Sequence, residues 1–346
     1  MVAVDLDDDE HIDVIGCTDE DFPRVIVNYN IGGVSWERQE LEVPLFVFRL
    51  AIADVNEDGR RDIICVLNNG YLAWLENHGS RSFEFRYLTA NSLDAPALLI
   101  ADIDHDDRSE IFVAHGNSPH AIFIYNDWQD GDPGVLGSVA MVPGSNDYGP
   151  VISMGVADFN NDTFLDLAVV TNDSRVYIHM FDNSSSPYYR TGDLVYAGNS
   201  PVMSTVTGVF NNIEIASLSS NSSTDILIAF TYTDKLVYIH DLSGNGTKWQ
   251  EVVIDDQNST SEDDTDYLIA AAGADIDGDG DLDIVAYRAR GRQLSVYENL
   301  GHGNFDSEQT LYSIRRLCGL HILGSVPLGD FDGDGHVDLA FRVALQ

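Results

Sequence analysis

Asp275-Ile-Asp-Gly-Asp-Gly-Asp-Leu-Asp283 is the stretch that decides the fold of this chain. Its first, third, fifth and ninth residues carry side-chain oxygens, and Gly280 at the sixth position permits a sharp turn. Carboxylates packed this closely repel one another unless a cation lies between them. Oxygen ligands at alternating positions suit Ca²⁺, which accepts six to eight of them. Apolar runs at 268–274 and 284–287 flank the stretch, which therefore predicts a β-hairpin with a metal-binding loop.

The same nine-residue window recurs along the chain at spacings between 48 and 59 residues. A repeat with this period predicts a propeller or a solenoid. The predicted metal ligands of the six good copies are Asp5, Asp7, Asp9 and Asp13; Asp54, Asn56, Asp58 and Asp62; Asp102, Asp104, Asp106 and Glu110; Asp158, Asn160, Asp162 and Asp166; Asp275, Asp277, Asp279 and Asp283; and Asp330, Asp332, Asp334 and Asp338. A seventh, degraded copy at 217–225 offers one carboxylate, and we expect it to bind no metal.

Each repeat has the same order of signals. An apolar strand ends in a small residue before the loop, and a second strand leaves from the ninth loop position. A third strand follows, rich in β-branched and aromatic residues. Three of these third strands lead into a turn of the form Asn-x-Gly-x-x-x-aromatic, at 30–36, 77–83 and 299–305. The aromatic residue begins a fourth strand that we expect to pack against a neighbouring sheet. Four strands per repeat predict one propeller blade, and no segment shows helical periodicity.

These loops and turns resemble the FG-GAP/VCBS repeats found in the integrin α-subunit head and in many secreted proteins. The resemblance implies an all-β, seven-bladed β-propeller of four-stranded blades, with Ca²⁺ in the loop between the first two strands of a blade. It implies a single domain over residues 1–346, with units starting near residues 1, 50, 97, 152, 205, 268 and 323. The last blade lacks an outer pair of strands, so we expect a fragment or an incompletely closed ring.

The six loops differ in the sixth position. Gly occupies it in the loops at 54–62, 275–283 and 330–338, which are the strongest predicted sites. Glu10, Asp107 and Thr163 occupy it in the other three. The alternative interpretation of any one copy is an ordinary Asp-rich turn, but six copies in phase favour up to six Ca²⁺ ions. We expect these ions to be structural, because such a loop folds tightly only when its carboxylates are screened.

The composition limits the classes of partner that we expect this protein to bind. The formal net charge is −39, with 18 Lys and Arg residues, and nearly half of the 57 Asp and Glu residues lie in the seven windows. Such a surface disfavours nucleic acid and anionic membranes, although a saline habitat would also favour it. No apolar run is long enough for direct membrane insertion. Cys17, Cys65 and Cys318 lie in apolar runs and are interpreted as buried free thiols, with one disulfide pair left open.

Secretion is suggested by two features. Sequons for N-glycosylation begin at Asn161, Asn172, Asn183, Asn221, Asn245 and Asn258. Calcium modules of weak affinity also suit extracellular calcium concentrations. We therefore expect a secreted glycoprotein, or the lumenal or extracellular part of a membrane-anchored protein.

No sequence motif for catalysis occurs in the chain. His179 and His240 occupy matching third-strand positions and are interpreted as features of the repeat. The leading hypothesis is a calcium-stabilised, non-enzymatic recognition or adhesion module with a protein or glycan ligand. One alternative is a polysaccharide lyase or hydrolase, or its attached propeller. Another is a lectin with sugar sites between blades, where Tyr71, Tyr177 and Tyr238 would stack on sugars unless they belong to the core.

Overall fold

The computed structural model describes residues 1–18, 22–88, 97–116, 121–128, 136–173, 175–182, 189–197, 212–216, 225–230, 235–243, 245–256, 268–288, 293–313 and 328–340. These residues form β-strands and one 3-10 turn, Ser145–Asp147. The strands are β1 (Val2–Val4), β2 (Asp13–Cys17), β3 (Arg24–Ile31), β4 (Ser35–Glu42), β5 (Val47–Ala53), β6 (Asp62–Leu67), β7 (Leu72–Asn77), β8 (Phe83–Tyr87), β9 (Ala97–Ala101), β10 (Glu110–Ala114), β11 (Ile122–Trp128), β12 (Leu136–Met141), β13 (Val151–Ala157), β14 (Asp166–Thr171), β15 (Arg175–His179), β16 (Asp193–Ala197), β17 (Asn212–Ala216), β18 (Asp225–Phe230), β19 (Lys235–Asp241), β20 (Trp249–Asp256), β21 (Leu268–Ala274), β22 (Asp283–Arg288), β23 (Gln293–Tyr297), β24 (Gln309–Ser313), β25 (Leu328–Gly329) and β26 (Asp338–Leu339).

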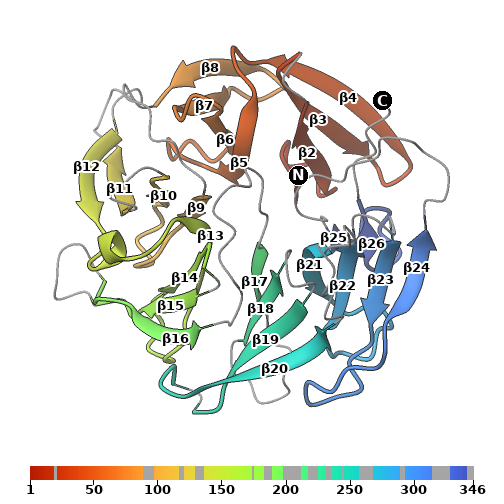
Figure 1. Ribbon diagram of the computed structural model, residues 1–346. Helices are drawn as coiled ribbons and strands as arrows, with labels where there is room; N and C mark the ends of the chain where they lie inside the picture. Colours follow the sequence, from red (N-terminus) through yellow and green to blue (C-terminus); the bar gives the residue numbers. More distant parts are fainter. Residues whose placement is uncertain are drawn as a thin grey trace. The chain divides into compact units, whose positions relative to one another are not determined.

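The strands form antiparallel sheets in which sequence neighbours pair (Figure 1). Six sheets have four strands each: β1–β4, β5–β8, β9–β12, β13–β16, β17–β20 and β21–β24. The predicted all-β fold of four-stranded propeller blades is therefore confirmed. The number of blades differs from the prediction, because the described residues form six complete blades and not seven. The seventh repeat forms the two-stranded sheet β25–β26, since two strands are all that the described part of this repeat contributes.

Sequence pattern explains which strands lie inside a blade. The two middle strands of the second sheet, β6 and β7, are buried along their whole length and are almost continuously apolar. Continuous apolar runs are typical of strands covered on both faces. The outer strand β4 is rich in charged residues and is mostly exposed. Such charges protect a free sheet edge from pairing with another chain.

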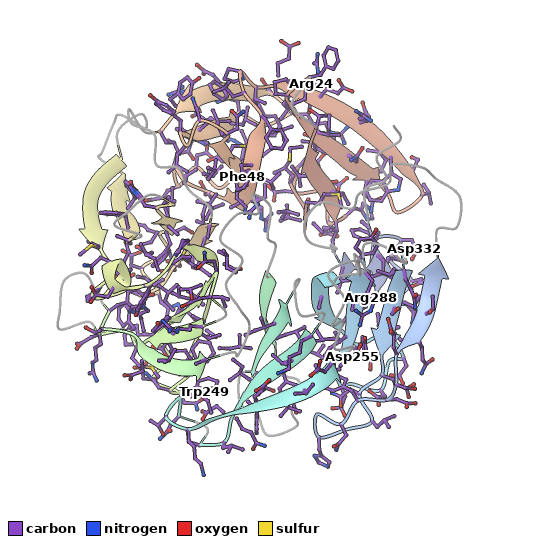
Figure 2. The ribbon with its side chains drawn as sticks, in the orientation of Figure 1. Arg24, Phe48, Trp249, Asp255, Arg288 and Asp332 are labelled. Atoms are coloured by element: carbon purple, nitrogen blue, oxygen red, sulfur yellow. The ribbon has the colours of Figure 1, made fainter. Side chains whose placement is uncertain are left out.

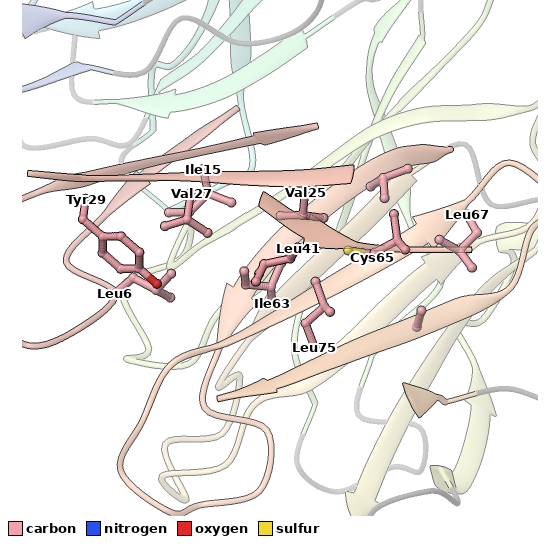
Figure 3. Packing of buried hydrophobic residues seen from close by; sticks show 13 residues of the cluster. Leu6, Ile15, Val25, Val27, Tyr29, Leu41, Ile63, Cys65, Leu67 and Leu75 are labelled. Carbon is pink, nitrogen blue, oxygen red and sulfur yellow. The ribbon is translucent and has the colours of Figure 1, made fainter. Parts of the chain in front are cut away.

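The described residues group into two compact units. The first contains Met1–Met154, His179–Gly192 and Gly329–Asp338. Its largest core lies between the sheets β1–β4 and β5–β8, where Ile15, Val25 and Val27 face Ile63 and Leu75 (Figure 3). These side chains are almost completely removed from solvent, and burial of this kind is the main favourable term in folding.

The second unit contains Gly155–Ile178, Asp193–Leu328 and Leu339–Gln346. One of its cores joins Leu227 and Tyr238 to Ile284 and Tyr297, from the sheets β17–β20 and β21–β24. Another core of this unit contains Tyr287 together with Val285, Leu294 and Val296. Both cores lie between residues of successive repeats, which is how a repeat that cannot bury its apolar faces alone becomes stable.

The aromatic residues of the three turns pack as predicted. Phe83 contacts the core between the first two sheets. Phe305 lies 6.0 Å from Tyr238 of the preceding repeat, measured between ring centroids. Trp36 lies 6.0 Å from Phe331 at an angle of 64°, although it remains 50% exposed.

Two further expectations concern the described residues. Neither Cys17 nor Cys65 forms a disulfide within the described residues; Cys65 is buried as predicted, whereas Cys17 is half-buried and donates to the backbone oxygen of Val47. Burial raises the pKa of the Cys65 thiol far above its usual range. Cys318 and the degraded loop at 217–224 lie outside the described residues. Within the described part of the chain, no helix has the length and hydrophobicity needed to cross a membrane.

Candidate functional site

The six predicted metal loops all lie between the first two strands of their repeats. They connect β1 to β2, β5 to β6, β9 to β10, β13 to β14, β21 to β22 and β25 to β26. The predicted hairpin position of the loops is therefore correct. The small residues before the loops, such as Ala53 and Ala274, end the first strands as expected.

The backbone of all six loops bends in the same way. The fourth and sixth positions have positive φ in every copy, with values between 59° and 95°. Several of the residues at these positions are not glycine, and Thr163 among them has a φ of 80°. A β-branched residue rarely adopts this conformation, and it persists only where the surroundings impose it. The loop geometry is thus retained even where the sequence lacks the favourable glycine.

The ninth-position carboxylate connects each loop to its blade. Asp13 accepts hydrogen bonds from the backbone N–H groups of Leu6 (3.0 Å) and Asn30 (2.8 Å). The first bond closes the loop and the second ties it to the third strand. The loop-closing bond recurs from Val55 to Asp62, Ile103 to Glu110, Phe159 to Asp166, Ile276 to Asp283 and Phe331 to Asp338. The strand bond recurs from Asn77 to Asp62 and from Asn299 to Asp283.

Three of the ninth-position carboxylates, those of Asp13, Asp62 and Glu110, are buried, and burial raises their pKa. Asp13 and Asp62 are 0% exposed, and each has its pKa raised to about 6. Burial also raises the pKa of Glu110 to about 7, to which the nearby Asp104 and Asp106 add. The raised pKa values reflect the cost of burying negative charge beside other carboxylates. A bound cation would remove that cost.

The first and fifth positions organise the rest of the loop. In the first loop, the Asp5 carboxylate accepts the N–H groups of Asp9 and Glu10, and Asp9 accepts that of His11. In the last loop, Asp330 accepts the N–H groups of Asp334 and Gly335 in the same way. These bonds hold each carboxylate against the backbone of its own loop.

Carboxylate oxygens converge in four of the loops. The groups are Asp5, Asp7 and Asp13; Asp102, Asp104 and Glu110; Asp275, Asp277 and Asp279; and Asp330, Asp332 and Asp338, and the oxygens of each group lie within 4.8 Å of one another. Asp7 Oδ1 and Asp104 Oδ1 are buried and accept no hydrogen bond. A buried acceptor without a partner is costly, so both atoms suit a cation ligand. These residues therefore fit a hard divalent ion such as Ca²⁺.

The other two loops have an amide at the third position. Asn56 Nδ2 donates to Asp58 Oδ2 at 3.1 Å, and Asn160 Nδ2 donates to Asp162 Oδ2 at 3.0 Å. Arg60 also forms an ion pair with Asp58. In these two loops the fifth-position carboxylate accepts a hydrogen bond from the side-chain amide of the third position.

Contacts from the following repeat reach the first loop, and sequence reasoning missed them. Arg81 Nε donates to Asp7 Oδ2 at 3.0 Å, and its guanidinium carbon lies 4.0 Å from the centroid of the Tyr29 ring. Arg61 Nη1 donates to the backbone oxygen of Asp5 at 2.8 Å. The arginines lie 56 to 74 residues from their partners. Only the stacking of successive sheets brings them together.

The loop at 330–338 receives an equivalent contact from the first repeat. Asn30 Nδ2 donates to the backbone oxygen of Phe331 at 2.6 Å. A Cβ atom placed on Gly33 would lie 2.8 Å from the backbone oxygen of Asp332, and Gly33 also has a φ of +72°. Glycine is required at this position by both the conformation and the space.

The repeat with the degraded loop uses a different partner for its ninth-position carboxylate. Asp225 is 0% exposed, and its Oδ1 lies 2.7 Å from His240 Nδ1. His240 lies opposite Asp225 in the β18–β19 pair, because Ile226 pairs with Ile239. In the repeat that we expect to bind no metal, the His240 imidazole thus contacts the ninth-position carboxylate of Asp225.

Comparisons with known proteins agree with this geometry. A family model described as FG-GAP-like repeat matches residues 54–113 and 275–341. No curated protein matches the sequence. A solved structure concerning recognition of non-reducing terminal N-acetylglucosamine by an Agrocybe aegerita lectin is 16% identical, covering 99% of this chain and 84% of that chain, with a TM-score of 0.62.

Two solved structures of BBS1N in complex with ARL6DN are also similar. One is 12% identical, with a TM-score of 0.55, and covers 99% of this chain and 86% of that chain. The other is 12% identical, with a TM-score of 0.53, and covers 92% of this chain and 83% of that chain. At these identities the likeness shows a common fold. The family match identifies the repeat unit: at residues 54–113 and 275–341, the chain carries FG-GAP-like repeats.

Proposed function

We propose that this chain is a calcium-stabilised recognition module, in which Ca²⁺ is structural and a protein or glycan ligand binds elsewhere on the blades. The observation that carries the proposal is the convergence of carboxylate oxygens in four loops with one shared geometry. Each ion would be held by the first, third, fifth and ninth side chains of a loop. By fixing the hairpin between the first two strands, it would stabilise the whole blade.

The proposal includes a seventh blade. Leu328 and Leu339, from the two strands of the last sheet, pack against the core around Tyr287. This packing supports the interpretation of β25 and β26 as the inner strands of a further blade.

A chelation experiment tests the role of the metal. The protein is unfolded by heat in excess Ca²⁺ and again in excess chelator, and calorimetric titration gives the number of ions bound. A ligand that binds only the folded state stabilises it by about 2.7 kcal/mol at a hundredfold excess over Kd. We expect several ions per chain and a large fall in the unfolding midpoint on chelation. An unchanged midpoint would refute a structural role for Ca²⁺.

A glycan is the second candidate ligand, and one cluster of aromatic residues favours it. Tyr87 is 46% exposed, and its ring centroid lies 5.8 Å from that of Tyr71 and 5.1 Å from that of Phe85. The exposed Asn68 and Asn69 lie in the turn before Tyr71. Exposed tyrosine rings beside amide groups are suited to stacking on a sugar and hydrogen bonding to its hydroxyl groups.

The other two predicted stacking residues differ in exposure. Tyr238 is 3% exposed, and its hydroxyl donates to the backbone oxygen of Gly303, so it belongs to the core. Tyr177 is half-buried. A glycan array probed with the parent protein and with Tyr87→Ala tests the lectin hypothesis. Glycan binding that is lost in the variant supports a sugar site at Tyr87. If the parent protein binds no glycan on the array, the lectin hypothesis is rejected.

The enzyme alternative receives less support from the described residues. A cluster of the kind that would favour it does occur, because Arg288 contacts Asp255, Tyr297 and Glu308. Figure 2 labels Arg288 and Asp255 of this cluster. Arg288 is only 5% exposed, and Tyr297 donates its hydroxyl to Asp255 Oδ2 at 2.7 Å. These groups bind one another, which supports a role in holding two repeats together.

A further inference from the structure

A second kind of metal site is suggested by the hairpin β7–β8, outside the six loops. Glu76 and Glu84 lie directly opposite each other on the two strands. His78 follows two residues after Glu76, so its side chain lies on the same side of the hairpin. Like charges placed directly opposite each other destabilise a sheet unless a cation neutralises them. The hairpin therefore concentrates two carboxylates and one imidazole at a single point.

The ligand atoms of these three residues are already spaced as in a metal site. His78 Nε2 lies 3.3 Å from Glu84 Oε2 and 3.9 Å from Glu76 Oε2. Adjacent ligand atoms of a tetrahedral zinc site are about 3.3 Å apart, given bond lengths near 2.0 Å. One ligand atom from each of the three residues lies within 4.8 Å of the other two, so the group is placed to share one ion after a small adjustment.

Glu76 is oriented by a contact on its other side. The residue is 8% exposed, and its Oε1 accepts a hydrogen bond from Asn56 Nδ2 at 3.3 Å. Its Oε2 is buried and has no partner that meets hydrogen-bond geometry. A metal-binding carboxylate is commonly held in this way, with one oxygen fixed by a neighbour and the other directed at the ion.

Arg86 is the cation that now neutralises the pair. Its Nη2 lies 2.9 Å from Glu76 Oε2 and 3.2 Å from Glu84 Oε2, and its guanidinium carbon lies 5.7 Å from the centroid of the Trp74 ring. Its Nε is buried without a hydrogen-bond partner. The Arg86 and Glu84 side chains are 33% and 57% exposed, and an ion pair this accessible is weak, whereas the Glu76 side chain is 11% exposed. Because Arg86 is itself one-third exposed, its guanidinium can move into solvent when a metal ion takes over the neutralisation of both carboxylates.

The histidine is not required by the turn itself. The corresponding residue after the turn Asn is Ile31 in the first repeat and Leu300 in the sixth. The same turn thus forms with an aliphatic residue, and the imidazole needs another explanation. Imidazole with two carboxylates suits Zn²⁺ and similar transition metals better than Ca²⁺, which prefers oxygen ligands.

We propose that Glu76, His78 and Glu84 bind one Zn²⁺-like transition-metal ion, separate from the calcium loops. The three protein ligands leave a fourth position open to solvent, because the His78 side chain is 40% exposed. The binding takes place at the end of the hairpin and requires Arg86 to give up its two carboxylate partners.

Titration with Zn²⁺ in saturating Ca²⁺ tests this proposal, because Ca²⁺ then occupies the oxygen-rich loops. The full chain is titrated calorimetrically, and Co²⁺ is used as a spectroscopic probe of nitrogen and oxygen ligation. We expect one ion that Ca²⁺ does not displace. His78→Ala and Glu84→Gln should each weaken binding by about tenfold or more. Arg86→Gln should strengthen it, because the competing cation is lost.

His302→Ala is the matched control, since His302 lies in the equivalent turn of the sixth repeat. It should leave zinc affinity unchanged. Thermal unfolding of each variant in Ca²⁺ checks that the blade remains folded. The proposal is overturned if Zn²⁺ fails to bind in the presence of Ca²⁺. It is overturned equally if a folded His78→Ala variant binds Zn²⁺ as tightly as the parent.

Discussion

Replacing the ninth-position Asp13 by Asn separates the two roles of this carboxylate. Asp13 accepts one backbone N–H from Leu6 and another from Asn30, at 3.0 and 2.8 Å, and is 0% exposed. The amide of an Asn side chain has one oxygen and one NH₂ group. One of the two backbone donors would therefore face another donor instead of an acceptor. The variant tests the hydrogen-bonding role without changing the size of the side chain.

The expected loss of stability in the Asp13→Asn variant differs between protein with bound Ca²⁺ and protein without it. In excess chelator, one buried N–H loses its acceptor, which costs about 1–3 kcal/mol of the free energy of unfolding. In excess Ca²⁺, the variant also loses a charged ligand. If the ion then no longer binds at that loop, about 2.7 kcal/mol more is lost at a hundredfold excess over the parent Kd. The variant should thus lose about twice as much stability in Ca²⁺ as in chelator.

Urea unfolding of the parent and variant under both conditions measures the two losses. Asp8→Asn is the control, because Asp8 has a φ of 60° and its side chain is 58% exposed. It should change stability by less than about 0.5 kcal/mol. Equal losses for Asp13→Asn in Ca²⁺ and chelator would show that this carboxylate is no metal ligand. No loss in either condition would contradict its role in joining the loop to the third strand.

Three further predictions concern other parts of the chain. Arg288→Ala should cost about 2–4 kcal/mol in denaturant unfolding, because it leaves the carboxylates of its partners without a cation; a change near zero would contradict the role of this cluster in joining repeats. Burial acts to raise the pKa of Asp241, but hydrogen bonds from Ser243 and from the Gly246 N–H outweigh it and lower that pKa. A lowered folded-state pKa stabilises the protein above the unfolded pKa of about 3.9, so the stability gap between the parent and Asp241→Asn should close as pH falls below that value; a pH-independent gap would be the contrary result. Gly33→Ala should lower the unfolding midpoint more than Gly32→Ala, because both have positive φ but only Gly33 would place a Cβ against backbone; equal midpoints would contradict the close approach.

The hairpin loops and the strands around them could be predicted closely. The sequence predicts a third strand leading into the turn at 77–83, and β7 is Leu72–Asn77. The loop ligands lie within nine residues of one another, so their spacing reports local geometry directly. The left-handed conformation of Thr163 was harder to predict, because its side chain disfavours the φ of 80° that the loop imposes.

The contacts between repeats could not be predicted in the same way. Arg81 contacts Asp7, and Asn30 contacts Phe331, only because sheets from different repeats pack against each other. Nothing near Arg81 in the sequence indicates its partner. The grouping of Glu76 with Glu84 likewise depends on the register of one hairpin, in which a shift of one residue would place the two carboxylates on opposite faces.

By itself, the sequence determined the repeat, its strands and the loops that present oxygen ligands, since each of these is set by residues close together in the chain. Only the tertiary structure decided which side chains from different repeats share those loops. It also decided that six blades are complete among the described residues. The physical reason is that burial between sheets acts over long sequence separations, where local periodicity carries no information about the partner.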